Sequence, residues 1–302
     1  YGDHRDLHLS IRRQRQMCIR DSSIRAHYSH SDKMNITSIT SFTETNLIHA
    51  YDGDWADSIY WHDNHGFDPA VEGWAYDFYD KTKRNRTNLS QEIRLSIGSI
   101  ILGGYFKHLK EQDEAIGYLF GGIATNAWSA YDFKVMAGYS QYEHDLSPTI
   151  KLKANVRFEQ NIMDYKGTSE GLNENWEKVV LPPVKFNVEH SMLGYRGSIH
   201  YLKDEFTSFY GSVSQGYKSG GVNQQPYLSD KNRPFDPEFI QNFEIGLKRA
   251  TDIYRTQLSA FYSKRNDQQV SISSQQDKEN PNSFLFYTAT VSYTHLTLPT
   301  NR

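Results

Sequence analysis

The sequence has little of the features that mark several common protein classes. It holds one cysteine, Cys18, among 302 residues, so no disulfide bond forms within the chain. It has no apolar run of about 18 residues, the length from which a membrane-spanning helix is recognised. Its mean hydropathy is only −0.71. A disulfide-framed domain and a helical membrane segment are therefore both excluded for these residues.

The cysteine lies in a basic stretch, residues 12–21, that reads RRQRQMCIRD, while residues 291–300 read VSYTHLTLPT. The reverse complement of one set of codons for the first stretch translates into the second, so one DNA segment in two orientations encodes both. That segment resembles the transposase-delivered adapter of DNA libraries. We therefore expect residues 1–22 and 291–302 to be non-native ends and 23–290 to be the native domain. The alternative is a genuine basic arm.

Without these ends the chain has no cysteine, and its acidic residues outnumber its basic ones. The ends hold six basic and three acidic residues of the 33 and 36 in the whole chain, which leaves 27 against 33 and a net charge of −6. Nucleic acid is not an expected partner, because binding to a polyanion requires a basic surface.

Aromatic residues are abundant although the hydropathy is low. They make up 14% of the chain, with 21 Tyr and 16 Phe, whereas disordered chains are depleted in aromatics. A transmembrane β-barrel combines both properties, because only alternate residues face lipid, the lumen is polar, and aromatic girdles lie at both interfaces.

Alternation with period two is the main structural pattern. Residues 150–159, IKLKANVRFE, alternate without exception, which predicts a strand with one face in lipid and the other toward a lumen. The apolar face holds Ile150, Leu152, Ala154, Val156 and Phe158, and the polar face holds Lys151, Lys153, Asn155, Arg157 and Glu159. Residues 89–96, 133–139, 243–248 and 257–262 repeat the pattern; Gln91 is an exception, and Phe133, Val135, Ala137 and Tyr139 share a face.

The predicted connections between strands are of two kinds, short turns and long loops. Short turns are predicted at 96–99, 144–149, 203–206 and 249–252, and long polar loops at 110–126, 161–183, 219–237 and 264–283. Outer-membrane barrels have short periplasmic turns and long external loops, whereas a β-sandwich does not sort in this way. A propeller would show a repeat of about 40 residues, which is absent.

The predicted fold class is all-β, an incomplete transmembrane antiparallel β-barrel. At roughly ten residues for each crossing, residues 34–290 hold about ten to twelve strands. Residues 284–290, FLFYTAT, are predicted to be a barrel strand that is cut off at the non-native end. An open barrel in lipid would leave costly unpaired strand edges, so we expect the native barrel to contain further strands.

Several motifs resemble the barrel of TonB-dependent outer-membrane receptors. They are QEIRL (91–95), HDLSPTIKLKANVRFE (144–159), GYKSGGVN (216–223), SAFYSKRNDQQV (259–270), and the set Pro237, Glu238, Glu244, Gly246 and Lys248. Their order and spacing carry the resemblance over most of residues 34–290.

The resemblance implies a 22-stranded barrel in the outer membrane of a Gram-negative bacterium, filled by an N-terminal plug that lies outside this sequence. The partners it implies are membrane lipid, the TonB complex through a missing N-terminal segment, and a ligand that is a metal chelate or another nutrient. The implied function is TonB-energised uptake of a large scarce nutrient, most often a ferric siderophore. The alternatives are a passive porin-type channel and a soluble carbohydrate-binding β protein.

The residues singled out by these motifs have structural interpretations. Gly220 and Gly221 are expected to relax the backbone where a strand enters a loop. Tyr210 and Tyr217 are expected at the membrane interface, and Glu244 and Lys248 on the luminal face. Lys151, Lys153 and Arg157 either steer anionic ligands or pair with carboxylates of neighbouring strands or of the plug. The ligand-binding residues are unknown.

The acidic segment 51–68 contains Asp52, Asp54, Asp57, Asp63 and Asp68 with His62 and His65. Its spacing matches no calcium loop and is too loose for zinc, so we expect a hydrated external loop and no metal site. Trp55 and Trp61 of this segment are alternatively girdle residues. No catalytic set is visible; we expect no enzyme activity and no cofactor.

Overall fold

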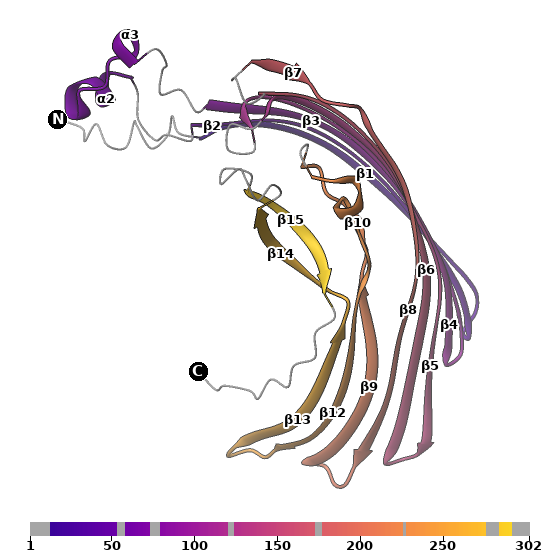
Figure 1. Cartoon of the computed structure of the whole chain (residues 1–302). Coiled ribbons are helices and arrows are strands. Elements are labelled where there is room, and N and C mark those ends of the chain that lie inside the picture. Colours follow the sequence, from indigo (N-terminus) through magenta and orange to yellow (C-terminus); the bar gives the residue numbers. More distant parts are fainter. Residues whose placement is uncertain are drawn as a thin grey trace, which may run out of the picture.

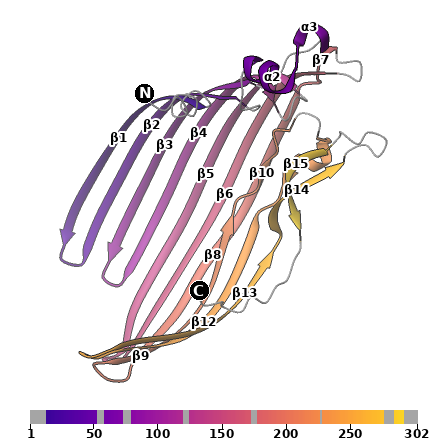
Figure 2. The ribbon, with the colours of Figure 1, turned by 90° about the vertical axis from the view of Figure 1, so that its left-hand side faces the viewer.

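The computed structural model describes residues 13–52, 58–72, 79–119, 124–172, 177–225, 228–275 and 284–291. These residues form a curved antiparallel wall of long strands that lie side by side (Figures 1 and 2). The strand order in the wall is β1-β2-β3-β4-β5-β6-β8-β9-β12-β13, and β7 pairs with β6. Each long strand pairs with the next one along the chain, which confirms the predicted all-β, antiparallel and incomplete barrel.

The wall strands are β1 Arg13–Ser31, β2 Met34–Asp52, β3 Tyr79–Ile97, β4 Ile100–Leu119, β5 Ala124–Ser147, β6 Ile150–Leu172, β8 Val184–Leu202, β9 Thr207–Lys218, β12 Glu238–Ala250 and β13 Arg255–Asn266. The shorter elements are α2 Ser58–His65, α3 Pro69–Glu72, β7 Lys178–Val180, β10 Gly221–Val222, η1 Asp230–Asn232, β11 Pro234–Phe235, β14 Gln268–Gln275 and β15 Phe284–Val291. None of the helices in the described ranges has the length and apolar character to span a membrane.

The wall strands are longer than a membrane requires. β5 has 24 residues and β6 has 23, whereas about 9–11 residues cross the hydrocarbon core. Residues 110–119 and 161–172 therefore continue β4 and β6 beyond the lipid, and the prediction of loops there was wrong. A strand outside the lipid has no apolar face, so alternation of hydropathy gives no sign of it.

The four predicted short turns are confirmed, at residues 98–99, 148–149, 203–206 and 251–254. Gly98 has a φ of 54°, which a two-residue hairpin turn needs. In the β8–β9 turn, the Asp204 carboxylate accepts the backbone N–H of Phe206 at 2.9 Å, and this hydrogen bond lowers the pKa of Asp204. All these turns lie at one end of the wall (Figure 2).

The predicted faces of β6 are confirmed. Val156 and Phe158 are 42% and 54% exposed on the convex face. Arg157 and Asn161 lie on the opposite face and contact Tyr217 and Ser219. The chain that follows Ser219 forms β10, which lies inside the curve of the wall (Figure 1). The polar face of β6 is therefore the concave one.

The apolar set of β5 lies on the concave face, not the lipid-facing one. Phe133, Val135, Ala137 and Tyr139 do share a face, but Tyr139 pairs directly with Arg157 and its hydroxyl donates to Glu92. The convex face of β5 instead carries residues such as Met136 and Gly138. Alternation groups side chains into two faces, but the register with neighbouring strands decides which face meets lipid.

The break in alternation at Gln91 has a local explanation on the convex face. The Gln91 amide Nε2 donates to the Ser38 hydroxyl at 2.9 Å, and the Thr40 hydroxyl donates to the Gln91 carbonyl oxygen. Polar groups in lipid are costly unless they are hydrogen-bonded. The three side chains satisfy one another across β2 and β3.

Residues 284–290 are a strand, but not a strand of the wall. They belong to β15, which pairs with β14 in a separate two-stranded sheet inside the curve (Figure 1). Asp267, between β13 and β14, has a φ of 53°. This left-handed residue, which aspartate tolerates better than most, turns the chain out of the wall, and the sequence pattern does not reveal it.

The predicted non-native end contributes to β1. Residues 13–22 pair in continuous register with residues 42–51 of β2. Backbone pairing depends little on side-chain identity. The register therefore does not show whether residues 13–22 are native, and the domain limits 23–290 stay a prediction. Residues 1–12 and 292–302 lie outside the described residues.

Candidate functional site: the concave face

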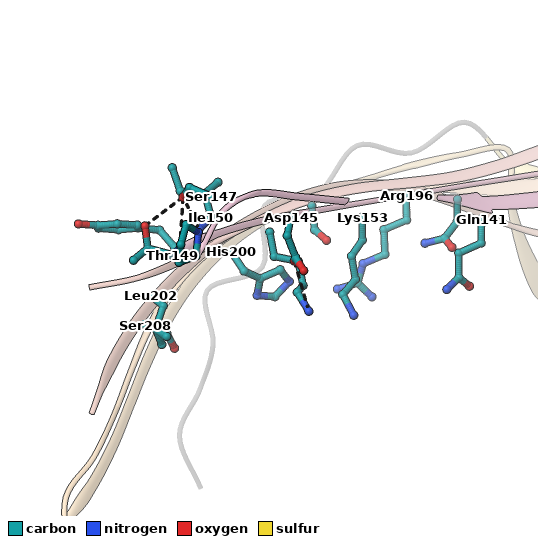
Figure 3. A pocket seen from close by; sticks show the side chains of 15 residues that line it. Gln141, Asp145, Ser147, Thr149, Ile150, Lys153, Arg196, His200, Leu202 and Ser208 are labelled. Atoms are coloured by element: carbon teal, nitrogen blue, oxygen red, sulfur yellow. Dashed lines mark hydrogen bonds and ion pairs between the residues drawn. The ribbon is translucent and has the colours of Figure 1, made fainter. Parts of the chain in front are cut away.

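The turn end of the concave face holds a basic hollow. It measures about 960 Å³ and is lined by residues of β5, β6, β8 and β9; Lys153, Arg196 and His200 all point into it (Figure 3). Lys151 Nζ lies 3.2 Å from a Glu143 carboxylate oxygen, and Lys153 Nζ lies 3.1 Å from the other. The expected pairing with carboxylates of a neighbouring strand is therefore present, and one glutamate serves two lysines.

The middle of the concave face carries two networks of charged and phenolic groups. Arg94 donates to Glu92 at 2.8 Å and to the Tyr139 hydroxyl at 3.2 Å. Further along the wall, Arg157 Nε donates to Glu159 at 3.0 Å and to the Tyr217 hydroxyl at 3.1 Å. Hydrogen bonds between ionised groups are the stronger kind, so these networks fix the inward side chains of several strands.

The loop end of the concave face holds buried acid–base pairs. Asp113 and Glu111 on β4 are 8% and 7% exposed. Arg84 binds Asp113 with two parallel hydrogen bonds of 2.7 and 2.6 Å, and Arg86 pairs with Glu111. A buried carboxylate is costly unless it is paired with a cation. The two arginines therefore compensate the buried charges of Asp113 and Glu111 at the loop end of the wall.

An inner segment, residues 219–225 and 228–235, packs on this end of the concave face. Asn161 Nδ2 donates to the Ser219 hydroxyl at 2.9 Å, and the Tyr131 hydroxyl reaches the Val222 carbonyl oxygen at 3.5 Å. Val222, Leu228 and Arg233 are 7%, 2% and 4% exposed. Buried residues of the described chain therefore gather where this segment meets the wall, and the segment itself lies in a region predicted to be a loop.

Gly220 has a packing role that differs from its predicted one. A Cβ there would lie 2.3 Å from the Phe235 carbonyl oxygen and 2.5 Å from the His190 ring, and Gly220 has no left-handed φ. Gly221 likewise lies against the Phe235 ring. The two glycines permit close approach to the wall and to β11, and they lie just after the end of β9; their role in relaxing the backbone stays a prediction.

The inner segment also holds the β14–β15 hairpin. The Asn223 amide donates to the Thr288 carbonyl oxygen and accepts the Thr288 N–H, both at 2.8 Å. Gln269 Nε2 donates to the Ser219 carbonyl oxygen at 2.8 Å. The segment and the hairpin are thus bonded to each other inside the curve (Figure 1).

A second cavity lies between the inner segment and the wall. It measures about 250 Å³, and its lining includes Arg84, Asp113, Tyr165, Gln224 and Arg233. Guanidinium, carboxylate, amide and phenol groups meet there, so the cavity offers hydrogen-bond donors and acceptors to a polar ligand group.

The two tyrosines predicted at the membrane interface lie elsewhere. The Tyr210 hydroxyl donates to Glu244 at 2.6 Å, and the Tyr217 hydroxyl donates to Glu159 at 3.2 Å. Both hydroxyls therefore reach the concave face, and the interface prediction was wrong. Glu244 and Lys248 lie on the concave face as predicted, with Lys248 Nζ 5.3 Å from the Tyr210 ring centre.

The acidic segment 51–68 is only partly described. His62 and Asp63 lie on α2 with His62 Nδ1 3.0 Å from the Asp63 carboxylate, and this pairing raises the pKa of His62. Trp61 also lies on α2 rather than on a strand, so the girdle alternative for Trp61 was wrong. Asp54, Trp55 and Asp57 lie outside the described residues. Among the described residues, no three metal-ligating side chains gather.

Sequence reasoning did not find the residues that meet the inner segment. Tyr131, Asn161, Tyr165 and Arg233 come from separate strands and a loop, and only the fold brings them together. Tyr165 is 3% exposed, and its ring centre lies 4.8 Å from that of Tyr131. The only sign of them in the sequence was an aromatic residue, Tyr165, within a stretch predicted to be a polar loop.

Three solved structures show the same fold at low sequence identity. The ferric yersiniabactin uptake receptor of Yersinia pestis matches with a TM-score of 0.64 and 17% identity, over 85% of this chain and 37% of that one. A copper transporter matches at 0.62 and 11%, over 93% and 43%. The ferric-catecholate import receptor of E. coli K12 matches at 0.58 and 13%, over 91% and 44%. This chain therefore spans less than half the length of these proteins.

No curated protein matches the sequence. Residues 6–296, nearly the whole chain, match the family described as TonB dependent receptor-like, beta-barrel. That family and the matching receptor structures place the chain in the outer membrane of a Gram-negative bacterium. The chain belongs to the TonB-dependent receptor-like β-barrel family.

Proposed function

We propose that the chain is part of a receptor that takes up a ferric siderophore with energy supplied through TonB. The observation that carries the proposal is the family match over residues 6–296. Two of the structures with the same fold are named as ferric chelate receptors. The concave face adds a physical argument, because a large polar chelate needs a wide channel whose wall presents fixed donors and acceptors.

The arrangement of the concave face suits stepwise passage. The cavity beside Tyr165 and Arg233 lies at the loop end, where a ligand arrives from outside, and the basic hollow around Lys153 and Arg196 lies at the turn end. Outer-membrane barrels place their long loops outside and their turns in the periplasm. An anionic chelate would therefore first meet a cavity whose positive and negative side chains balance. It would last meet a hollow whose side chains are mainly positive.

A passive channel is the second candidate, because the inner segment folds onto the wall as a narrowing loop would. The third alternative, a soluble carbohydrate-binding protein, is not supported. The convex face exposes Ile245 at 67% and Leu258 at 63%, which suits lipid rather than water.

Uptake of iron-55 as a ferric chelate separates the two remaining candidates. The gene that carries this chain is expressed in an iron-starved Gram-negative strain that lacks its own chelate receptors, with and without a functional TonB. Energised transport predicts that uptake of at least one chelate falls to background without TonB, while passive glucose entry is unchanged. Equal uptake in both strains would establish the passive channel instead.

A further inference from the structure

The inner segment and the β14–β15 hairpin meet at the Asn223 side chain. Its amide pairs as a strand backbone does, because it donates to the Thr288 carbonyl oxygen and accepts the Thr288 N–H, both at 2.8 Å. The same Nδ2 lies 3.2 Å from the Asn232 and Arg233 carbonyl oxygens, and the Asn223 N–H donates to the Arg233 carbonyl oxygen at 2.7 Å. One side chain therefore joins both strands of the inner segment to β15.

Gln269 on β14 provides a second connection between the same two elements. Its Nε2 donates to the Ser219 carbonyl oxygen at 2.8 Å and to the Asp236 carbonyl oxygen at 3.0 Å. Asp236 follows the inner segment directly, and its N–H donates to the Thr290 hydroxyl at 2.9 Å. The hairpin is therefore tied to the segment at its start, at Asn223 and just past its end.

The wall holds the inner segment through other side chains. Asn161 Nδ2 donates to the Ser219 hydroxyl at 2.9 Å, and the His190 ring packs against Gly220. Asn161 is 2% exposed, so its hydrogen bond is shielded from water. Ser219 thus bonds to the wall with its hydroxyl and to the hairpin with its carbonyl oxygen. The wall and the hairpin are linked through the segment.

The inner segment also forms one side of the cavity at the loop end. Gln224, which follows Asn223, lines the cavity together with Arg233, while Arg84 and Tyr165 line it from the wall. A polar group bound there contacts both the wall and the segment. A ligand that binds one arrangement of the two better than another shifts the population toward it. Any such shift reaches the hairpin through Asn223.

We propose that the inner segment and the β14–β15 hairpin move as one body, linked at Asn223 and Gln269, so that occupancy of the cavity sets the position of the hairpin in the lumen. Asp267, where the chain leaves β13 with a φ of 53°, is the hinge on the hairpin side. The coupling is reciprocal, because the position of the hairpin then acts on the cavity to the same extent. Uptake through TonB is compatible with two elements that move independently, so this proposal and the proposed function fail separately.

Distances between paired spin labels test the coupling without a ligand, in the receptor encoded by the gene that carries this chain. One label of each pair is at Ser99, in the exposed β3–β4 turn. The other is at Ser229 of the inner segment or at Ser273 of the hairpin, both of which are exposed. The perturbing variant N161A removes the wall's hydrogen bond to Ser219, and S219A removes the same bond from the segment side should N161A not fold.

Each perturbing variant is measured in three backgrounds, all with Cys18 replaced by serine. The first has no further change. The second, N223A/Q269A, lacks the links between segment and hairpin. The third, N187A/Q241A, is the matched control, because it removes an asparagine and a glutamine of the wall whose side chains donate hydrogen bonds of 2.7 and 3.0 Å. Heat-modifiable migration on gels verifies folding of each variant.

In the first background, N161A is expected to raise the ratio of displaced to packed segment about fivefold, the effect of losing one net hydrogen bond. The hairpin pair is expected to show the same fivefold rise. N187A/Q241A is expected to preserve this joint response, whereas in N223A/Q269A only the segment pair responds. The proposal is overturned if the hairpin pair does not follow the segment pair, if neither pair responds to N161A or S219A, or if the hairpin still follows in N223A/Q269A.

Discussion

Replacing Val156 with arginine is expected to lower the free energy of unfolding in lipid vesicles by about 2–4 kcal/mol, the cost of an arginine on the lipid face of a barrel near the midplane. Val156 lies at the centre of the alternating stretch of β6 and is 42% exposed on the convex face. The natural Arg157, one residue along the strand, has no such cost because it faces Glu159 and Tyr217. Urea unfolding followed by tryptophan fluorescence measures the difference.

The matched control places the same side chain on the other face. Ser212 pairs directly with Glu244 across β9 and β12, so Ser212→Arg meets a carboxylate on the concave face. We expect a change within about 0.5 kcal/mol, as for most substitutions away from buried features. If Ser212→Arg is as harmful as Val156→Arg, the two faces do not differ in their surroundings as described.

Replacing Arg84 with leucine is expected to destabilise the protein by about 3 kcal/mol, because the Asp113 carboxylate would remain buried without its partner. Removing one partner of a buried ion pair costs about 3–5 kcal/mol. We expect the low end of this range because the Arg84 side chain is 34% exposed, while that of Asp113 is only 10% exposed. The same urea titration measures this loss.

The double variant Arg84→Leu with Asp113→Leu tests the cause. In the double variant no uncompensated Asp113 carboxylate remains buried. Most of the stability lost in Arg84→Leu is therefore expected to return. Lys151→Gln, which breaks an exposed pair with Glu143, is expected to change stability little. Equal losses in the single and double variants would show that packing of the Arg84 stem, rather than charge pairing, stabilises the loop end.

The sequence predicts those features that depend on local pattern. The faces of β6 follow from residues 150–159 because lysine and arginine alternate there with large aliphatic side chains. The turn at Gly98 follows from a short gap between two apolar strands. The family resemblance was sufficient to identify the class of barrel, because several motifs follow one another at suitable spacing from residue 91 to 270.

Other features depend on register and non-local contacts, which a single sequence does not contain. Val135 and Ala137 look like lipid-facing residues, yet pairing with β6 turns them inward. Tyr217 looks like an interface residue, yet its hydroxyl reaches Arg157 from β9. The inner segment reads as a polar loop, since nothing local indicates that Val222 and Leu228 pack against the wall.

The sidedness of the strands supports the whole account, and cysteine labelling along β6 tests it most directly. Cys18 is the single cysteine of the chain, so a Cys18→Ser background accepts one new cysteine at each position from 150 to 159. In intact outer membranes, a charged maleimide is expected to label positions 155 and 157, and a lipid-soluble maleimide positions 156 and 158. Labelling of 156 and 158 by the charged reagent in preference to 155 and 157 would contradict the assignment of convex face to lipid and concave face to lumen.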